Sequence, residues 1–308
     1  MSDENKKLIS KIVIERERLR NVGRVTRLMR DPRRALPFYL LAVISHLIPY
    51  KISFKTLWGK KMTCYLPEGN TFYYYGYCEA NLTNFFIRLV KAGDHFFDVG
   101  AHVGFYSMLT SLLVESTGKV VSFEPTPWTY LLLEKNVSGL ANVGTINKAV
   151  GDSEGVVALH DYGPGYGAYN SLNKKWAETM LKNRKKSRIL VEATTLDDYC
   201  SRNSIYPNVL KIDTEGFEFQ VLQGAKNLIV QNSAGPRPVI ALEVAGGKSW
   251  ATPQRQAIEF LVNQRFVPCE ISTDGSLRQG ILQDNYSYDN LAFIPEERLS
   301  ELAYLFKP

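Results

Sequence analysis

From about residue 54 onward, short apolar runs alternate with stretches in which apolar residues recur at helical spacing. Apolar runs of about four to eight residues, bounded by turn signals, are typical of buried parallel strands. We expect such strands at 95–100, 119–125, 144–150, 208–213 and 238–244, and helices at 103–115, 127–137, 217–230 and 253–263. This alternation predicts an α/β fold with a doubly wound, mostly parallel sheet. The last two apolar runs, 266–272 and 290–295, need no helix between them and predict a closing antiparallel pair.

Residues 151–207 interrupt this alternation. They contain two β-like runs, 155–162 and 188–196, on either side of a loop rich in Gly and Tyr and a lysine-rich helical stretch. The pattern predicts a β-rich insertion between the third and fourth strands of the main sheet.

The N-terminal part of the chain follows a different pattern. Between residues 6 and 34, apolar side chains recur mostly at three- to four-residue steps with arginines between them, which is typical of a basic amphipathic helix. The apolar stretch 36–50 follows, and it is shorter than the roughly 20 residues that a membrane-spanning helix needs. We therefore expect residues 1–53 to form a helical extension and residues 54–308 to form one domain.

The charge of the chain is unevenly distributed. The whole sequence has 37 Lys and Arg against 31 Asp and Glu, but residues 1–61 alone have 15 against 5, so the remainder is slightly acidic. A basic segment of this kind prefers phosphate groups. Its arginines can form the solvated face of a helix that packs on the domain, or residues 6–50 can dock on an anionic membrane surface. The acidic remainder disfavours a nucleic acid as partner.

The cysteines and the first residues bear on the cellular setting. None of the four cysteines stands in a CxxC pair or at zinc-finger spacing, so neither a structural zinc nor a disulfide framework is expected; they are Cys64, Cys78, Cys200 and Cys269. The first residues lack the pattern of a secretory signal. We expect a reducing, cytoplasmic setting, with residues 6–50 as the candidate for a peripheral membrane contact.

A glycine-containing loop follows the first strand of the expected sheet. Asp98, Gly100 and Gly104 form the pattern D-x-G-x-x-x-G. Gly100 allows a tight turn and a close approach of a ligand to the backbone, and Gly104 lets the next helix lie near the strand. Ligands of open α/β sheets bind at the carboxyl ends of the strands, so this loop is a candidate binding site.

Acidic and polar residues stand at the ends of the next two strands. Glu124 ends the second strand, where a carboxylate can accept hydrogen bonds from both hydroxyls of a ribose. Asp152 and Ser153 follow the third strand and are placed to contact an adenine edge. Dinucleotide sites use G-x-G-x-x-G with a pyrophosphate at the helix N-terminus, whereas Asp98 fills the first Gly position here and would repel phosphates. S-adenosylmethionine, a cationic nucleoside without phosphate, suits this site.

These motifs are similar, in order and spacing, to those of the FkbM family of S-adenosylmethionine-dependent methyltransferases over about residues 75–295. The stretches that carry the resemblance are FFDVGAHVGFYS, VSFEPTP, KAVGDSEG, TTLDDY, LKIDTEGFEFQVLQGA and IALEV. The resemblance implies the class I methyltransferase fold, which is a Rossmann-like, seven-stranded, mostly parallel sheet with one antiparallel strand. It also implies O-methylation of a natural product or a sugar.

The resemblance further implies which residues form the site. It places Asp98, Gly100 and Gly104 on the methionine side of the cofactor, Glu124 at the ribose, Asp152 at the adenine, and Lys211, Asp213, Glu215 and Glu243 at the reaction centre. We add to the expected cofactor site Ala101, His102, Pro125 and Ser153. The family usually has Asn where His102 stands, and we interpret this histidine as a support for the neighbouring backbone rather than as a base.

Transfer of a methyl group to a hydroxyl needs help with the hydroxyl proton. Asp213 can act as the base, its pKa raised by burial beside other carboxylates. Alternatively, Asp213, Glu215 and Glu243 can hold Mg²⁺, which binds oxygen ligands and acidifies a hydroxyl, or they can only orient the substrate. Lys211 would balance their charge, and Glu218 is expected to cap the next helix.

The insertion loop offers aromatic, imidazole, amide and hydroxyl side chains that suit a sugar, a glycan or a natural product. These candidate substrate contacts are His160, Tyr166, Asn170 and Ser171. We therefore expect an O-methyltransferase with a small-molecule or glycan acceptor, and the sequence is compatible with a homo-oligomer. The alternatives are a non-catalytic module that binds the cofactor or a glycan, and a nucleic-acid methyltransferase.

Overall fold

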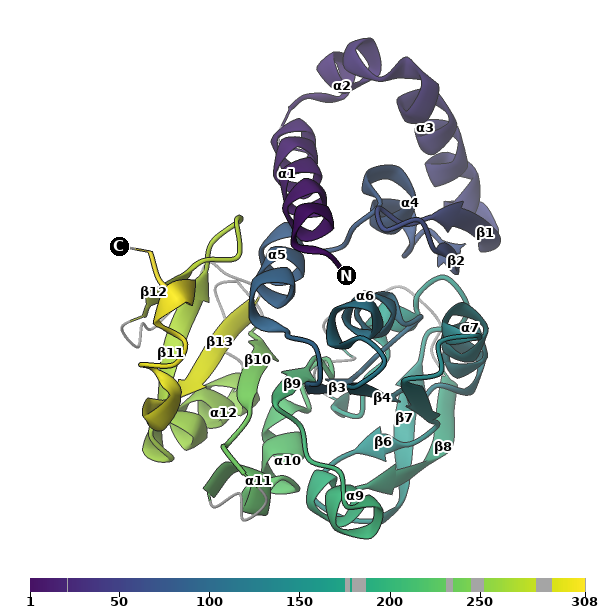
Figure 1. The fold of residues 1–308 in the computed structure, drawn as a ribbon. Coiled ribbons are helices and arrows are strands. Elements are labelled where there is room, and N and C mark those ends of the chain that lie inside the picture. Colours follow the sequence, from purple (N-terminus) through teal and green to yellow (C-terminus); the bar gives the residue numbers. More distant parts are fainter. Residues whose placement is uncertain are drawn as a thin grey trace.

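The computed structural model describes residues 1–20, 22–174, 178, 187–230, 235–244, 252–280 and 290–307. An eight-stranded sheet lies at the centre of the molecule, with helices on both of its faces (Figure 1). In order across the sheet, the strands are β12 (Leu277–Gln279), β11 (Phe266–Ile271), β13 (Asn290–Pro295), β10 (Val239–Glu243), β9 (Val209–Ile212), β3 (His95–Val99), β4 (Lys119–Phe123) and β5 (Val143–Ile146).

The directions of the strands agree with the expected mostly parallel sheet. The five strands from β10 to β5 are parallel to their neighbours. β13 runs antiparallel to both β10 and β11, so the predicted closing pair is confirmed. The seven strands from β11 to β5 form the Rossmann-like sheet that the family resemblance implies, and this fold class is confirmed. The short strand β12, antiparallel to β11, extends the sheet at one edge and was not predicted.

Helices cover both faces because the side chains of a buried strand alternate between two apolar layers. In β9, Val209 joins one layer, whereas Leu210 and Ile212 join the other. The first layer contains side chains of α5 (Ala80–Leu89), α6 (Phe105–Val114) and α7 (Pro127–Val137), and the second contains side chains of α9 (Leu196–Asn203), α10 (Glu218–Gln223), α11 (Lys226–Val230) and α12 (Thr252–Asn263). The expected single helix 217–230 is therefore two helices, α10 and α11, which Gly224 and the next residue separate.

The insertion forms a sheet of its own. Its strands are β6 (Ala149–Val150), β8 (Ser187–Thr194) and β7 (Gly155–Asp161), in that order, with β7 and β8 antiparallel. The predicted strand 144–150 is wrong in extent, because it is divided between β5 of the main sheet and β6 of the insertion. Asn147 turns the chain between them, and its side-chain amide donates to the carbonyl oxygen of Glu124 at 2.8 Å. The expected lysine-rich helix lies largely outside the described residues.

Three helices precede the sheet and form an arch on one side of it (Figure 1). They are α1 (Asp3–Arg20), α2 (Arg24–Arg30) and α3 (Pro32–Leu47), and the hairpin of β1 (Tyr50–Lys55) and β2 (Lys61–Leu66) and then α4 (Asn70–Tyr75) follow. The expected single helix over 6–34 is thus divided, and Pro32 stands in the first turn of α3, where its missing N–H costs nothing. Ile9 and Val13 of α1 are buried in the core. Within the described part of the chain, no helix is long and apolar enough to cross a bilayer.

Candidate active site

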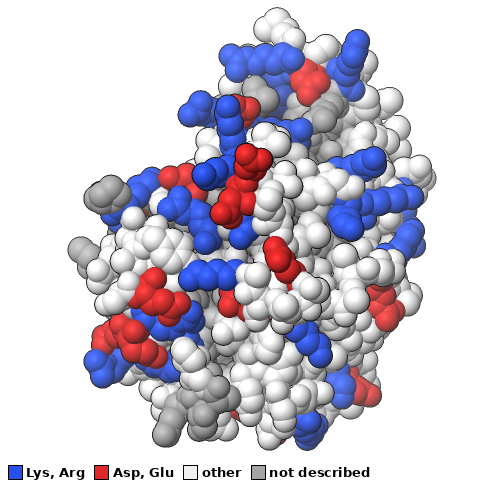
Figure 2. All heavy atoms as spheres, in the orientation of Figure 1, with Lys and Arg blue, Asp and Glu red and all other residues white. Residues whose placement is uncertain are grey.

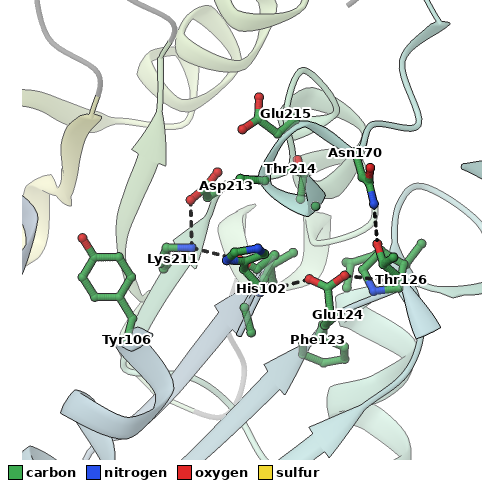
Figure 3. A pocket seen from close by; sticks show the side chains of 18 of the residues that line it. His102, Tyr106, Phe123, Glu124, Thr126, Asn170, Lys211, Asp213, Thr214 and Glu215 are labelled. Atoms are coloured by element: carbon green, nitrogen blue, oxygen red, sulfur yellow. Dashed lines mark hydrogen bonds and ion pairs between the residues drawn. The ribbon is translucent and has the colours of Figure 1, made fainter. Parts of the chain in front are cut away.

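A cavity opens at the carboxyl ends of β3, β4 and β9, where the sequence predicts ligand binding (Figure 3). Its walls come from the loops after these strands, the segment before α5, the turn before β6 and the insertion loop. The lining includes Glu79, Gly100, Ala101, His102, Glu124, Pro125, Thr126, Lys148, Asn170, Lys211, Asp213 and Glu215. Four carboxylates thus stand against two lysines, and this balance favours a cationic ligand over a phosphate.

The loop after β3 needs glycine at two positions for reasons of packing. Gly100 has φ +76°, and a Cβ there would lie 1.7 Å from the carbonyl oxygen of Asp213. Gly104 has φ +86°, and a Cβ there would lie 2.6 Å from Cδ1 of Leu133 in α7. Gly104 lies outside the cavity lining. Gly100 lines the cavity, so the expected approach of a ligand there stays a prediction. The structure adds a close contact of Gly100 with the turn after β9 and one of Gly104 with α7.

Asp98 lies beneath this loop and not in the cavity lining. Its side chain is fully buried; Oδ1 lies 3.2 Å from Nζ of Lys211, and Oδ2 accepts a hydrogen bond from Oγ of Ser107 at 2.7 Å. The expected contact of Asp98 with the methionine part of the cofactor is therefore corrected. Asp98 instead fixes the ammonium group of Lys211, which itself lines the cavity.

Glu124 lies in the cavity wall at the end of β4, where the sequence places it. Its side chain is buried; Oε2 accepts a hydrogen bond from the backbone N–H of His102 at 3.0 Å, and Oε1 accepts one from the N–H of Thr126 at 2.8 Å. Each carboxylate oxygen keeps a further lone pair for a ligand hydroxyl. Burial raises the pKa of Glu124, and the neighbouring His102 offsets part of this shift.

His102 links the loop after β3 to two other segments. Its φ is +51°, a left-handed conformation in which Asn and His are both enriched, which accounts for His at a position where the family usually has Asn. Its Nε2 lies 3.4 Å from Oε2 of the buried Glu68, which also accepts a hydrogen bond from the N–H of Ala168 in the insertion loop at 3.1 Å. Burial by itself lowers the pKa of His102, but the charge of Glu68 raises it to above its ordinary value. These contacts suit a supporting residue.

The adenine end of the site differs from the sequence expectation. Asp152 and Ser153 are exposed and lie outside the cavity lining, and Oγ of Ser153 donates to Asp152 at 3.1 Å. The lining here consists of Lys148, Ala149 and Val150 instead. The reason is the division of the predicted third strand, since the chain reaches the cavity edge a few residues earlier and has turned toward β7 by Asp152.

Lys211 connects the two sides of the cavity floor. Its Nζ lies 3.1 Å from Oδ2 of Asp213 and 3.2 Å from Oδ1 of Asp98, and it donates to the carbonyl oxygen of Gly100 at 3.2 Å. Burial by itself lowers the pKa of Lys211, but Asp213 and Asp98 raise it to above its ordinary value. Lys211 is therefore protonated and is placed as the charge partner of Asp213.

Three carboxylates meet where β9 and β10 end. Asp213, Glu215 and Glu243 each offer an oxygen within 4.8 Å of the others, although Glu243 lies outside the cavity lining. Burial raises the pKa of Glu243 well above its ordinary value, and the charges of Glu215 and Asp213 raise it further. Carboxylates this close need a proton or a cation among them to offset their repulsion.

Glu218 holds the turn that carries Glu215. Its Oε1 accepts hydrogen bonds from the N–H groups of Thr214 at 3.1 Å and Gly216 at 3.0 Å, and its side chain is fully buried. Glu215 between them has φ +53°, a conformation that non-glycine residues rarely adopt. Glu218 thus stabilises the turn before α10, in addition to the expected interaction with the start of the helix.

The raised pKa of Glu243 predicts how stability changes with pH. Above the ordinary pKa of 4.5, the folded state binds more protons than the unfolded state, so the free energy of unfolding falls as pH rises. We expect urea unfolding of the wild type to show this fall between about pH 5 and pH 8, and Glu243→Gln to make it smaller. Glu259→Gln, an exposed change on α12, serves as the control. An unchanged pH dependence in Glu243→Gln would contradict the assignment.

The insertion residues act mainly on the loop itself. Asn170 lines the cavity, and its side-chain amide donates to Oδ1 of Asp161 at 2.9 Å. Oγ of Ser171 donates to the carbonyl oxygen of Glu215 at 2.6 Å and so ties the loop to the turn after β9. The expected substrate contacts that lie outside the lining are His160, Tyr166 and Ser171. Asn170 is the one of the four that the structure places at the cavity.

Glu79 is a cavity residue that the sequence analysis did not identify. Its Oε2 accepts a hydrogen bond from the hydroxyl of Tyr106 at 2.9 Å, and its Oε1 accepts one from the side-chain amide of Asn290. Burial raises the pKa of Glu79, and the charge of Asp213 raises it further. The sequence gives only a weak indication that Glu79 belongs to the site, because it is a single acidic residue after a run of aromatic residues.

A Rossmann-like sheet, a buried carboxylate at the second strand end and an acid-lined cavity are features that the resemblance to S-adenosylmethionine-dependent methyltransferases implies. The sequence matches the methyltransferase FkbM domain over residues 98–266, which is more than half of the chain. The chain belongs to the FkbM methyltransferase family. A search of curated proteins finds no match to it.

Three solved structures to which this chain is similar share little of its sequence. A putative rRNA-methylase from Clostridium thermocellum has 10% identity and a TM-score of 0.38, and the alignment covers 69% of this chain and 90% of that one. A putative O-methyltransferase from Klebsiella pneumoniae has 12% identity and a TM-score of 0.39, with 70% and 79% covered. The O-methyltransferase from Bacillus cereus, in complex with SAH, has 12% identity and a TM-score of 0.36, with 70% and 80% covered. The family assignment rests on the sequence match.

Proposed function

We propose that this protein is an O-methyltransferase that acts on a hydroxyl of a sugar, a glycan or another natural product. The observation that carries the proposal is the pairing of Asp213 with the buried Lys211 in the same cavity wall as Glu215, next to the cofactor loop. A hydroxyl is a weak nucleophile at neutral pH and needs a base or a metal ion as it attacks. The carboxylates at this end of the cavity can act as the base or can bind the metal ion.

S-adenosylmethionine fits the groups that line the cavity. Its ribose hydroxyls are donors for the buried Glu124, and its two positive charges suit the excess of carboxylates. A phosphate-bearing ligand would be repelled by the same groups. When bound, S-adenosylmethionine supplies a methyl group on a sulfonium sulfur, and the C–S bond breaks as the acceptor oxygen bonds to the methyl carbon.

The residues of the chain have separate tasks in this reaction. Glu124 binds the ribose, and the backbone of the loop after β3 shapes the wall beside it. Asp213 takes the proton of the acceptor hydroxyl and becomes a carboxylic acid, while Lys211 stays protonated and holds Asp213 in place. Glu79 stands at the same end of the cavity and is a further acceptor of hydrogen bonds from the substrate.

Two other roles for the carboxylates are alternatives to general-base catalysis. Asp213, Glu215 and Glu243 have oxygens close enough to hold Mg²⁺, which would acidify the hydroxyl. In the other alternative, the carboxylates orient the hydroxyls of the acceptor and take no part in proton transfer or metal binding. Burial and the charges of Glu215 and Asp213 raise the pKa of Glu243, so a shared proton or a bound cation would each relieve the repulsion among the three carboxylates.

The proposed organisation follows the sequence expectations. Residues 1–53 form an extension that brings the enzyme to a membrane surface, and residues 54–308 form the catalytic domain with its insertion at 151–207; the boundary between them falls within β1. The proposed setting is the cytoplasm, in agreement with four cysteines that form no disulfide.

Calorimetry with S-adenosylhomocysteine tests the cofactor site. We expect the wild type to bind it and Glu124→Ala to weaken the binding by about 10- to 100-fold. Loss of a hydrogen bond to a charged acceptor, worth about 1.5–3 kcal/mol, corresponds to a change of this size. Asp152→Ala, at an exposed position outside the cavity, should bind like the wild type.

Two outcomes would refute this site: a wild type that does not bind, or a folded Glu124→Ala variant that binds equally well. Circular dichroism checks folding, because Glu124 also accepts two backbone N–H groups. Mass spectrometry of metabolites from cells with and without the protein would then identify the acceptor. Cofactor binding without any methylated product would favour the non-catalytic binding module.

A further inference from the structure

Helix α3 has an inner face that packs on the domain. Ala35 and Ser45 on this face are buried. The ring of Phe38 lies 4.6 Å from that of Tyr74 in α4, measured between centroids. The inner face thus accounts for the attachment of α3 to the rest of the molecule, and it leaves the opposite side of the helix uncovered.

The opposite side of α3 is apolar and exposed. We call it the α3 outer face and define it by Leu36, Leu40, Val43 and Ile44 together with Ile48, which directly follows the helix. These side chains are between 46% and 70% exposed. Their spacing of three to four residues places them on one side of the helix. A contiguous apolar strip of this kind on a protein surface marks an interaction site.

Basic residues flank both ends of the α3 outer face. The exposed Arg30 precedes α3, and the exposed Lys51 follows Ile48 in β1, whereas the exposed Arg33 and Lys55 line a groove together with Arg16 of α1 and Tyr74 of α4. Between residues 24 and 55 there are seven Lys and Arg against one Asp. Figure 2 shows Lys and Arg spread over the upper part of the molecule, where Figure 1 places the arch of α1 to α3.

This combination fits the surface of an anionic bilayer. Apolar side chains can enter the boundary between headgroups and acyl chains, while Lys and Arg contact the anionic headgroups. Tyr50, which is 55% exposed and follows Ile48 closely, suits the interface between these zones. A second protein copy would have to provide acidic groups around an apolar groove, and the basic surroundings of the strip disfavour contact with itself.

The α3 outer face is also connected to the cavity. Pro49 follows Ile48 and packs against the insertion loop, where a Cβ on Gly165 would lie 3.2 Å from Cβ of Pro49. The same loop lines the cavity through Gly167, Ala168 and Asn170. A bilayer in contact with the end of α3 would therefore lie beside the loop that borders the cavity.

We propose that the α3 outer face docks this protein on an anionic lipid bilayer. The contact surface is thus the apolar side of α3 with its flanking basic residues, and not the basic helix α1, whose Ile9 and Val13 are buried in the core. The proposal does not depend on the identity of the acceptor or on methyl transfer. It adds that an acceptor embedded in the bilayer would reach the cavity along the insertion loop.

Vesicle sedimentation tests the proposal with the full-length chain. The probes are phosphatidylcholine vesicles with and without phosphatidylglycerol. We expect the wild type to bind the vesicles with phosphatidylglycerol, with weaker binding at high salt and on pure phosphatidylcholine. Leu40→Gln/Val43→Gln should lower the partition coefficient by about tenfold or more, because two apolar side chains no longer enter the bilayer.

The control is Leu131→Gln/Leu190→Gln, which changes two equally exposed apolar side chains on α7 and β8 and should bind like the wild type. Retained binding of S-adenosylhomocysteine and an unchanged circular dichroism spectrum show that each variant is folded. Absence of wild-type binding to anionic vesicles, or equal binding by Leu40→Gln/Val43→Gln, would overturn the proposal. A dimer in ultracentrifugation that Leu40→Gln/Val43→Gln dissociates, without vesicle binding by the wild type, would assign the face to a second copy instead.

Discussion

Replacement of Asp213 by Asn is expected to lower the rate of methyl transfer by about 10²- to 10⁴-fold, the usual contribution of a general base. The amide cannot accept the proton of the acceptor hydroxyl, but it keeps the shape of the side chain. Lys211 remains paired with Asp98 at 3.2 Å, so the cavity wall should stay in place. Binding of S-adenosylhomocysteine should therefore be unchanged.

The measurement is transfer of a labelled methyl group to a metabolite extract, with and without EDTA. Asp152→Asn is the control, since its carboxylate is exposed and outside the cavity. Inhibition of the wild type by EDTA and recovery with Mg²⁺ would identify Asp213 as a metal ligand and not as the base. A full rate in Asp213→Asn together with insensitivity to EDTA would exclude both roles and leave orientation of the substrate.

Replacement of Lys211 by Met is expected to lower the free energy of unfolding by about 3–5 kcal/mol, the usual cost of removing one partner of a buried ion pair. Asp98 is fully buried, and among the described residues its Oδ1 has no hydrogen-bond donor apart from the ion pair with Lys211 at 3.2 Å. Without the ammonium group, a carboxylate charge would remain in the core. The effect arises because Lys211 neutralises this charge, and it should appear even without cofactor or substrate.

Urea unfolding measures this effect through the midpoint and the slope. Lys148→Met is the matched control: Lys148 also lines the cavity, but its ion pair with Glu192 is exposed, so its loss should cost about 1 kcal/mol or less. The double variant Asp98→Asn/Lys211→Met should recover part of the lost stability, because the unpaired charge is gone. If Lys211→Met costs no more than Lys148→Met, then the buried ion pair is not what holds the floor of the cavity.

The features that were predictable share a local origin. Strands β3, β4, β9 and β10 are apolar on both sides because they are buried on both faces, and such runs are visible in the sequence. Glu124, Lys211, Asp213 and Glu215 stand at or just past strand ends, and the carboxyl ends of parallel strands meet at one edge of a sheet. Fold class and most of the cavity floor followed from these two facts.

The features that were missed depend on contacts between distant segments. Glu79 lines the cavity from the segment before α5, and Glu68, in the turn after β2, contacts His102 of the cavity wall. Neither has a local pattern that points to the site. Asp98 stands in the right motif, but its ion pair with Lys211 takes it out of the lining. Asp152 was displaced because the run 144–150 belongs to two different sheets.

The difference between what the sequence determined and what the tertiary structure decided has a physical reason. Hydrophobic period and residue type act within a few residues along the chain, so they specified strands, helices, the excess of carboxylates and the basic character of the N-terminal segment. Burial and charge neutralisation act between segments far apart in sequence. They decided that Lys211 forms ion pairs with both Asp98 and Asp213, and that His102 pairs with Glu68. They also decided that Ile9 and Val13 of α1 are buried, while α3 keeps an apolar side exposed.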